Sequence, residues 1–71
     1  MKHYTARQLR KLPTLSQGQF SNLKIDDGKH RVWLSRMTVA DGMPYNNAVE
    51  VEALLDGVWT SVAQYPGGSA Q

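Results

Sequence analysis

The sequence predicts an α+β fold that is mainly β, with a short N-terminal helix and a four-stranded antiparallel meander. Asp27-Gly28 and Asp56-Gly57 each separate two runs in which apolar and polar residues alternate. Asp-Gly between such runs is a strong hairpin signal, because both residues tolerate positive φ. The helical pattern is confined to one short segment before Pro13. We therefore expect a single domain over residues 1–65 and a flexible Gly- and Ser-containing tail over residues 66–71.

The expected helix covers residues 5–12. Thr5 can cap its N-terminus, and Gln8 stands three residues later, as in a capping box. Pro13 ends the segment because the residue before a proline avoids the helical region. An eight-residue helix does not persist alone, so its apolar side, with Leu9, should dock on the sheet.

The first hairpin is expected to have Asp27-Gly28 as a two-residue loop, so that Leu23 faces Val32. Alternation then places two sets of side chains on opposite faces of the sheet. One set is Leu23, Ile25, Val32 and Leu34; the other is Phe20, Lys24, Arg31, Trp33 and Met37.

The second hairpin turns at Asp56-Gly57, so that Leu55 faces Val58 and Val51 faces Val62. Its apolar face carries Val49, Val51, Ala53, Leu55, Val58 and Val62, and its other face carries Glu50, Glu52, Leu54, Trp59, Ala63 and Tyr65. Pairing of residues 30–37 with 48–55 brings Leu34 opposite Val51 and Arg31 diagonal to Glu52, where an exposed ion pair can form. The connection over residues 38–47 contains Met43-Pro44-Tyr45, an apolar turn that either contacts a partner or folds over the core.

Composition excludes several classes of protein. The chain has no cysteine, which excludes disulfides and thiolate chemistry. It also has no apolar run of membrane-spanning length and no secretory signal. We therefore expect a cytoplasmic protein. The histidines lack ligand spacing, so no metal is expected, and no motif implies a cofactor. Ser35, His30 and Asp41 supply the residue types of a hydrolytic triad, but each has an ordinary strand or turn position, so we expect no enzyme.

The aromatic residues are the most informative candidates for a binding site. Alternation places them on the face opposite the aliphatic core. Two interpretations follow. Either the sheet curls so that both faces are covered, or the aromatic face contacts another protein, which is a partner or a second copy in a homodimer. The candidate protein-binding residues are Phe20, Arg31, Trp33, Met43, Tyr45, Trp59 and Tyr65.

The distribution of charge along the chain indicates an alternative function. Residues 1–31 hold seven Lys or Arg against two Asp, and the remainder is acidic, so the halves either neutralise each other or the basic half faces an acidic partner. A nucleic-acid-binding accessory protein would use Arg7, Arg10, Lys11, Lys24 and Lys29. Glu50 and Glu52 on the aromatic face oppose phosphate.

One stretch of the chain begins with Arg31-Val32-Trp33-Leu34-Ser35-Arg36-Met37-Thr38-Val39. It continues with Asp41-Gly42, Pro44-Tyr45, Asn47, Val49-Glu50-Val51-Glu52 and Asp56-Gly57-Val58-Trp59. This stretch resembles short orphan proteins of bacteriophage and prophage genomes. The resemblance covers about residues 19–65 and carries no functional residues, because that group has no established activity. It implies a genomic setting in which small proteins often bind and block a host protein, including components of antiviral defence. The expected function is thus a non-enzymatic inhibitor or modulator of a host protein that acts by occlusion in the host cytoplasm.

Overall fold

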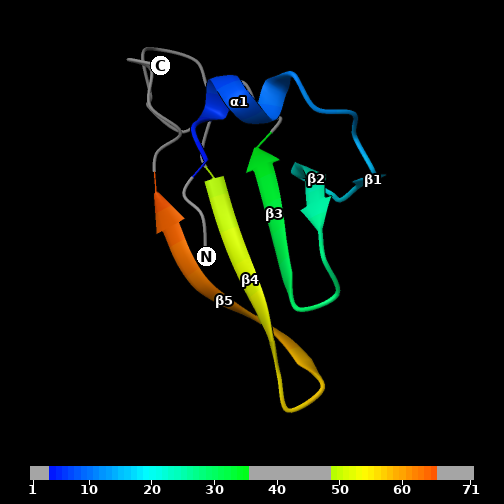
Figure 1. The fold of residues 1–71 in the computed structure, drawn as a ribbon, viewed down its shortest axis with the longest axis vertical. Helices are drawn as coiled ribbons and strands as arrows, with labels where there is room; N and C mark the ends of the chain where they lie inside the picture. The colour runs from blue at the N-terminus through cyan, green and yellow to red at the C-terminus, as the bar shows by residue number, and fades with distance from the viewer. Residues whose placement is uncertain (1–3, 36–48, 66–71) are drawn as a thin grey trace.

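The computed structural model describes residues 4–35 and 49–65, which form a five-stranded antiparallel sheet with one short helix across one end (Figure 1). The elements are α1 (Ala6–Arg10), β1 (Ser16–Gln17), β2 (Ser21–Asp26), β3 (His30–Ser35), β4 (Val49–Leu55) and β5 (Val58–Tyr65), and the strands follow one another in this order across the sheet. The mainly β class is confirmed. The sheet has five strands rather than the expected four because residues 16–17, for which no strand was expected, pair with β2.

α1 is short and well capped. The Thr5 hydroxyl accepts a hydrogen bond from the Gln8 backbone N–H at 3.1 Å, and the Gln8 side chain accepts one from the Thr5 N–H at 2.9 Å. The predicted capping box is therefore present. Ala6 and Leu9 are fully buried, so α1 adds its apolar side to the core. No helix in the described part of the chain is long and apolar enough to cross a membrane.

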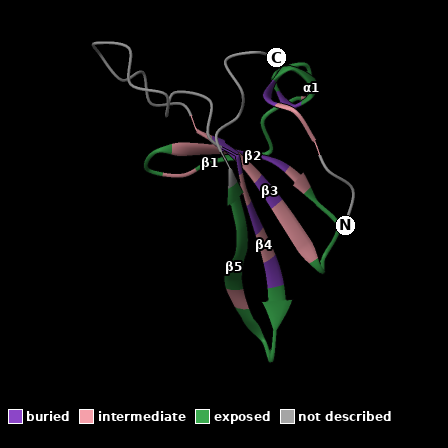
Figure 2. Ribbon diagram, turned by 90° about the vertical axis from the view of Figure 1, so that its left-hand side faces the viewer, coloured by how far each residue is buried: buried purple, intermediate pink, exposed green. Residues whose placement is uncertain are grey.

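The core lies between α1 and one end of the neighbouring strands β3 and β4 (Figure 2). Its buried members are Ala6, Leu9, Val32, Leu34, Val49 and Val51, with Tyr4, Leu12 and Ile25 packed against them. Because these side chains come mainly from α1, β3 and β4, the core is confined to the end of the sheet that the helix covers.

The β4–β5 hairpin projects past the other strands (Figure 1). Its turn is Asp56-Gly57, with φ of 50° and 79°. Leu55, Val58 and Val62 were expected in the core, but they are 50%, 62% and 50% exposed. The expectation was wrong because a five-residue helix covers only one end of the sheet, and no other described element covers this apolar row.

The β2–β3 register also differs from the prediction. Leu23 pairs with Trp33, not with Val32, because the β2–β3 connection is wider than two residues and Lys24 forms a bulge. The Asp27 carboxylate widens the connection by accepting the N–H groups of Lys29 at 2.8 Å and His30 at 2.6 Å. The bulge inverts the faces of β2 from Ser21 to Lys24, so Leu23 now lies on the Trp33 side and Lys24 on the α1 side.

The other two registers are shifted without inverting β3 or β4. Leu34 pairs with Val49 rather than Val51, a shift of two residues that keeps every side chain on its predicted face. In β5, Val62 is an extra residue, so Val51 pairs with Ala63 instead of Val62. This bulge is the reason that the predicted register fails in the second half of β5.

Candidate functional site

The side of the sheet opposite α1 carries the candidate site. We call it the open face and define it by Phe20, Arg31, Trp33, Glu50, Glu52 and Trp59. Trp33 stands opposite Glu50, and Arg31 stands opposite Glu52, on the paired strands β3 and β4. The alternate residues of the same strands, Val32 and Val51, belong to the core beneath α1. The open face therefore follows from the two-residue period of β3 and β4.

Arg31 is held in the middle of the open face. Its Nε donates to Oε1 of Glu52 at 3.1 Å, and its Nη2 forms an ion pair with the same oxygen at 3.0 Å. Trp33 Nε1 also donates to this oxygen, at 2.6 Å. The guanidinium carbon lies 4.0 Å from the centroid of the Trp59 ring and 5.7 Å from that of Trp33. The Arg31 and Glu52 side chains are only 23% and 18% exposed, so the ion pair is shielded rather than exposed as expected.

A shallow groove of about 230 Å³ lies beside this cluster. Its wall includes Trp33, and Phe20 is 53% exposed at its side. Gly18 lets the indole lie against the backbone, because a Cβ there would stand 3.2 Å from Trp33 Cζ3. The Gly18 N–H donates to the Ser21 carbonyl at 2.7 Å, which closes the tight turn between β1 and β2. The lining residues are Gly18, Gln19, Phe20, Ser21, Trp33, Glu50 and Glu52.

The groove favours a cation over an anion. Glu50 Oε2 accepts from the Gln64 amide at 2.8 Å, whereas Glu52 is engaged with Arg31. The six residues of the open face thus hold two carboxylates against one guanidinium. A positive charge over an aromatic ring and near a carboxylate is attracted to both. The Arg31 guanidinium beside Glu52 and Trp59 is one such arrangement already formed within this protein.

Four of the seven predicted protein-binding residues meet on the open face: Phe20, Arg31, Trp33 and Trp59. Met43 and Tyr45 lie outside the described residues, as does the side chain of Tyr65. Sequence reasoning placed Glu50 and Glu52 on the aromatic face but did not assign them to the site. It missed Gly18, Gln19 and Ser21 entirely, since the close approach of a glycine to an indole leaves no pattern in a single sequence.

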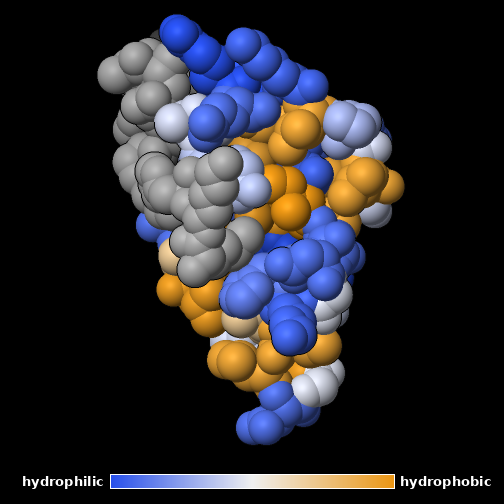
Figure 3. All heavy atoms as spheres, viewed as in Figure 1, coloured by the Kyte–Doolittle hydropathy of each residue, from blue (hydrophilic) through white to orange (hydrophobic). Residues whose placement is uncertain are grey.

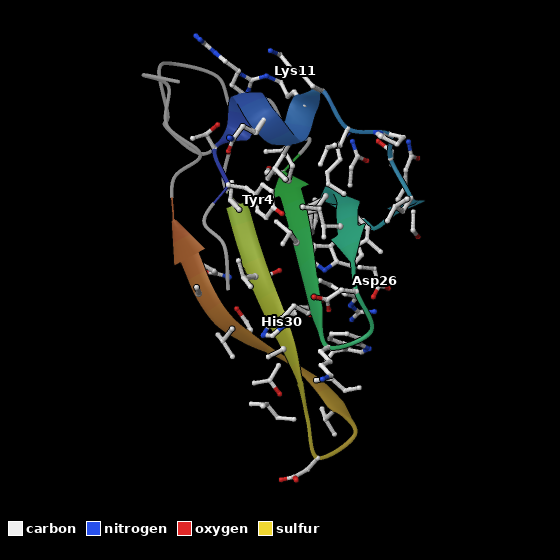
Figure 4. All side chains as sticks on the ribbon, viewed as in Figure 1. Tyr4, Lys11, Asp26 and His30 are labelled. Carbon is white, nitrogen blue, oxygen red and sulfur yellow. The ribbon has the colours of Figure 1, made fainter. Side chains whose placement is uncertain are left out.

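The residues proposed for nucleic acid do not form one surface. Arg7, Arg10 and Lys11 lie on the exposed side of α1, where Figure 3 shows hydrophilic residues at one end of the molecule. Lys29 is in the β2–β3 connection, directly before His30, which begins β3 at the end away from α1. Figure 4 labels His30 there and Lys11 beside α1. Lys24 is buried at 9% exposure, and its ammonium donates to the Leu12 carbonyl and the Thr14 hydroxyl, both at 3.0 Å. Lys24 therefore stabilises the fold. The prediction that it lies on the aromatic face was wrong, because its side chain is on the α1 side.

The triad of residue types does not assemble in the described structure. His30 and Ser35 stand at the two ends of β3, roughly 17 Å apart at about 3.3 Å per residue. Asp41 lies outside the described residues. Among residues 4–35 and 49–65, no three His, Asp or Glu side chains gather as a metal site would require.

Asp27 is the titratable group with the clearest perturbation. Its pKa lies below the usual value because the backbone N–H groups of Lys29 and His30 donate to the carboxylate. His30 Nδ1 is 3.9 Å from Asp27 Oδ2, which adds a weaker attraction when the imidazole is protonated. These bonds order the β2–β3 connection and lie apart from the groove.

Comparison of the chain with protein-family models, with curated proteins and with solved structures found no match.

Proposed function

We propose that this chain is a small non-enzymatic protein-binding module, and that a protein partner docks on the open face with a Lys or Arg side chain in the groove beside Trp33. The observation that carries the proposal is the groove, which joins an exposed Phe20 and the Trp33 ring to the carboxylate of Glu50. Aromatic side chains dominate the energetics of protein interfaces, and a carboxylate beside them selects a cation.

Preorganisation supports the same proposal. Arg31, Trp33 and Glu52 hold one another through two hydrogen bonds and an ion-pair contact to one oxygen, and Trp59 stacks on the guanidinium. A partner that docks against side chains already fixed in one geometry spends less conformational entropy on binding. The open face thus offers an ordered aromatic surface around a negatively charged groove, on a chain whose net charge is +2.

The mechanism we propose is occlusion, in which the open face covers a surface that the partner needs for its own function. The resemblance to phage and prophage orphan proteins makes a host protein, including a component of antiviral defence, the partner class in this proposal, with the host cytoplasm as the location. A bound module of this size hides surface on its partner without any chemical step.

A nucleic-acid-binding accessory role is the second candidate, favoured by the clustering of Arg7, Arg10 and Lys11 on the exposed side of α1. It is the weaker proposal because Lys24 is buried and Lys29 lies at the far end of β3. Binding carried by phosphate contacts weakens steeply as salt is added, whereas docking of an aromatic surface does not.

The test is quantitative capture of partners from a bacterial host lysate with three forms of the chain: wild type, Phe20→Ala and Leu15→Ala. Phe20 and Leu15 are similarly exposed, at 53% and 56%, but only Phe20 lines the groove. We expect Phe20→Ala to lose the captured protein at least tenfold and Leu15→Ala to retain it. Equal capture by all three forms, combined with loss of the captured protein in an Arg7→Ala, Arg10→Ala double variant, would contradict the proposal and assign partner binding to the exposed side of α1.

A further inference from the structure

The outer edge of β5 is uncharged, and among residues 4–35 and 49–65 nothing pairs with it, so we call it the open edge. β5 is the last strand of the sheet, and no strand among the described residues pairs with its outer side. Its eight residues, VWTSVAQY, include no Lys, Arg, Asp, Glu or Pro. Proteins usually protect an edge with charge or proline, since an unpaired edge is a template for another strand. Apart from the bulge at Val62, β5 lacks these protections.

The hydrogen-bond pattern shows which groups that edge presents. In a two-residue hairpin the pair flanking the turn exchanges both backbone hydrogen bonds, and the next pair exchanges none. Leu55 and Val58 flank the turn, and Leu54 and Trp59 are the next pair. The Leu54 N–H accordingly donates away from β5, to the Lys29 carbonyl at 2.9 Å. The backbone N–H and C=O of Trp59 therefore point to the open edge of β5.

We propose that a second copy of this chain pairs with β5 in antiparallel orientation, about a two-fold axis that passes beside Thr60. Ser61 stands two residues after Trp59, so its backbone groups also face the open edge. An axis at Thr60 brings Trp59 of each copy opposite Ser61 of the other, so outward-facing groups meet outward-facing groups. The two sheets then continue into each other across one closed, isologous contact.

This register also matches the side chains. On the α1 side of the sheet it sets Thr60 opposite Thr60 of the second copy and brings Val58 to the bulge residue Val62 of the second copy. Val58 and Val62 are 62% and 50% exposed in the single chain, and Leu55 beside Val58 is 50% exposed. Figure 3 shows this apolar surface on the projecting hairpin. β-branched pairs across adjacent strands stabilise a sheet, so pairing buries the apolar row that the single chain leaves in water.

Charge and size set the expected strength. The register places no charged side chain of β5 opposite another, because the strand has none. A contact made by one strand from each copy is at the small end of specific interfaces, below about 1,200 Å². We therefore expect a dimer that dissociates on dilution: in sedimentation, the mean mass should rise from 7.9 kDa toward twice that value with increasing concentration.

Thr60 provides the decisive variants, because it is exposed and would face itself across the axis. Thr60→Lys and Thr60→Glu should each weaken self-association at least tenfold, since like charges directly opposite on adjacent strands repel. An equal mixture of the two variants should associate again, because each Lys then meets a Glu. Unchanged melting temperatures at low concentration exclude unfolding as the cause. Failure of the mixture to associate when the wild type does would contradict the register.

A cysteine at the same position tests the geometry independently, because the natural chain has none. Thr60 pairs would be non-hydrogen-bonded, with Cα atoms about 4.5 Å apart, which is within disulfide reach. Thr60→Cys should form a covalent dimer on mild oxidation at least tenfold faster than the exposed control Arg7→Cys. Equal rates, or a wild type that stays at 7.9 kDa at all concentrations, would overturn the proposal. Phe20→Ala should leave self-association unchanged, which separates this edge from the open face.

Discussion

At the scale of single residues, Glu52 is the side chain on which the open face depends. One of its oxygens accepts from Arg31 and from the Trp33 indole, and the side chain is mostly shielded from water. We expect Glu52→Gln to lower the free energy of unfolding by about 1–2 kcal/mol, because hydrogen bonds between charged groups are among the stronger ones.

Glu50→Gln is the matched control for that change. Glu50 lies on the same strand and face, and its carboxylate accepts from the exposed Gln64 amide. Its replacement should cost no more than about 0.5 kcal/mol, because its hydrogen bond to Gln64 is exposed to water and joins no charged partner. Chemical denaturation of both variants measures the difference. Equal losses in the free energy of unfolding would show that Glu52, despite its contacts with Arg31 and Trp33, stabilises the protein no more than an ordinary surface carboxylate does.

Lys24 shows how burial changes the role of a basic residue. Its ammonium bonds the chain just after α1, at Leu12 and Thr14. Lys24→Ala removes both hydrogen bonds and the packed aliphatic stem, and should cost about 2 kcal/mol. Lys29→Ala, at an exposed loop position, should change stability by less than about 0.5 kcal/mol. If thermal unfolding showed the reverse order, Lys24 would not be the link between α1 and β2.

Asp27 should give the chain an acid-sensitive stability. Its pKa is lowered in the folded state by the Lys29 and His30 N–H groups. The stabilisation is therefore complete above the unfolded value of about 4 and is lost as the pH falls through the lower folded value. Asp27→Asn should flatten this part of the stability profile below about pH 4. A variant whose unfolding midpoint depends on pH as steeply as the wild type would contradict the assignment.

At the scale of elements, the β4–β5 turn depends on backbone freedom. Gly57 has a φ of 79°, and no atom lies within 4 Å of a Cβ built there, so a side chain would be strained without being crowded. Gly57→Val should cost about 1–2 kcal/mol, because a β-branched residue adopts positive φ poorly. Asp56→Asn, at a φ of 50°, should be nearly neutral because asparagine tolerates this region. Equal melting temperatures for wild type and Gly57→Val would contradict the turn geometry.

The elements also show what the sequence could predict. The capping box of α1 is a local pattern, and the faces of β3 and β4 follow from a two-residue period, so both were accessible. The bulges at Lys24 and Val62 were not, because an extra residue is set by the fit between strands and not by the strand's own sequence. The bulge at Lys24 had the largest consequence, since it moved a basic residue from the proposed surface to the inner side.

At the scale of the whole molecule, the short helix decides which surfaces are covered. α1 buries one end of one face and leaves the open face, the β4–β5 hairpin and the edge of β5 without a cover from any described element. The sequence predicted a complete aliphatic face, but five helical residues cannot cover seven- and eight-residue strands. The surfaces that remain are apolar, aromatic or unpaired, and these are the surfaces that proteins use for association.

The most direct measurement of the central claim is a hydrogen-exchange footprint of this chain with and without a captured protein partner. Docking on the open face predicts slower exchange at the backbone of residues 18–21 and at the Trp33 indole N–H, with the exposed side of α1 unchanged. Protection confined to residues 7–11, with the groove exchanging as in the free chain, would contradict the claim and assign the partner to the basic side of α1.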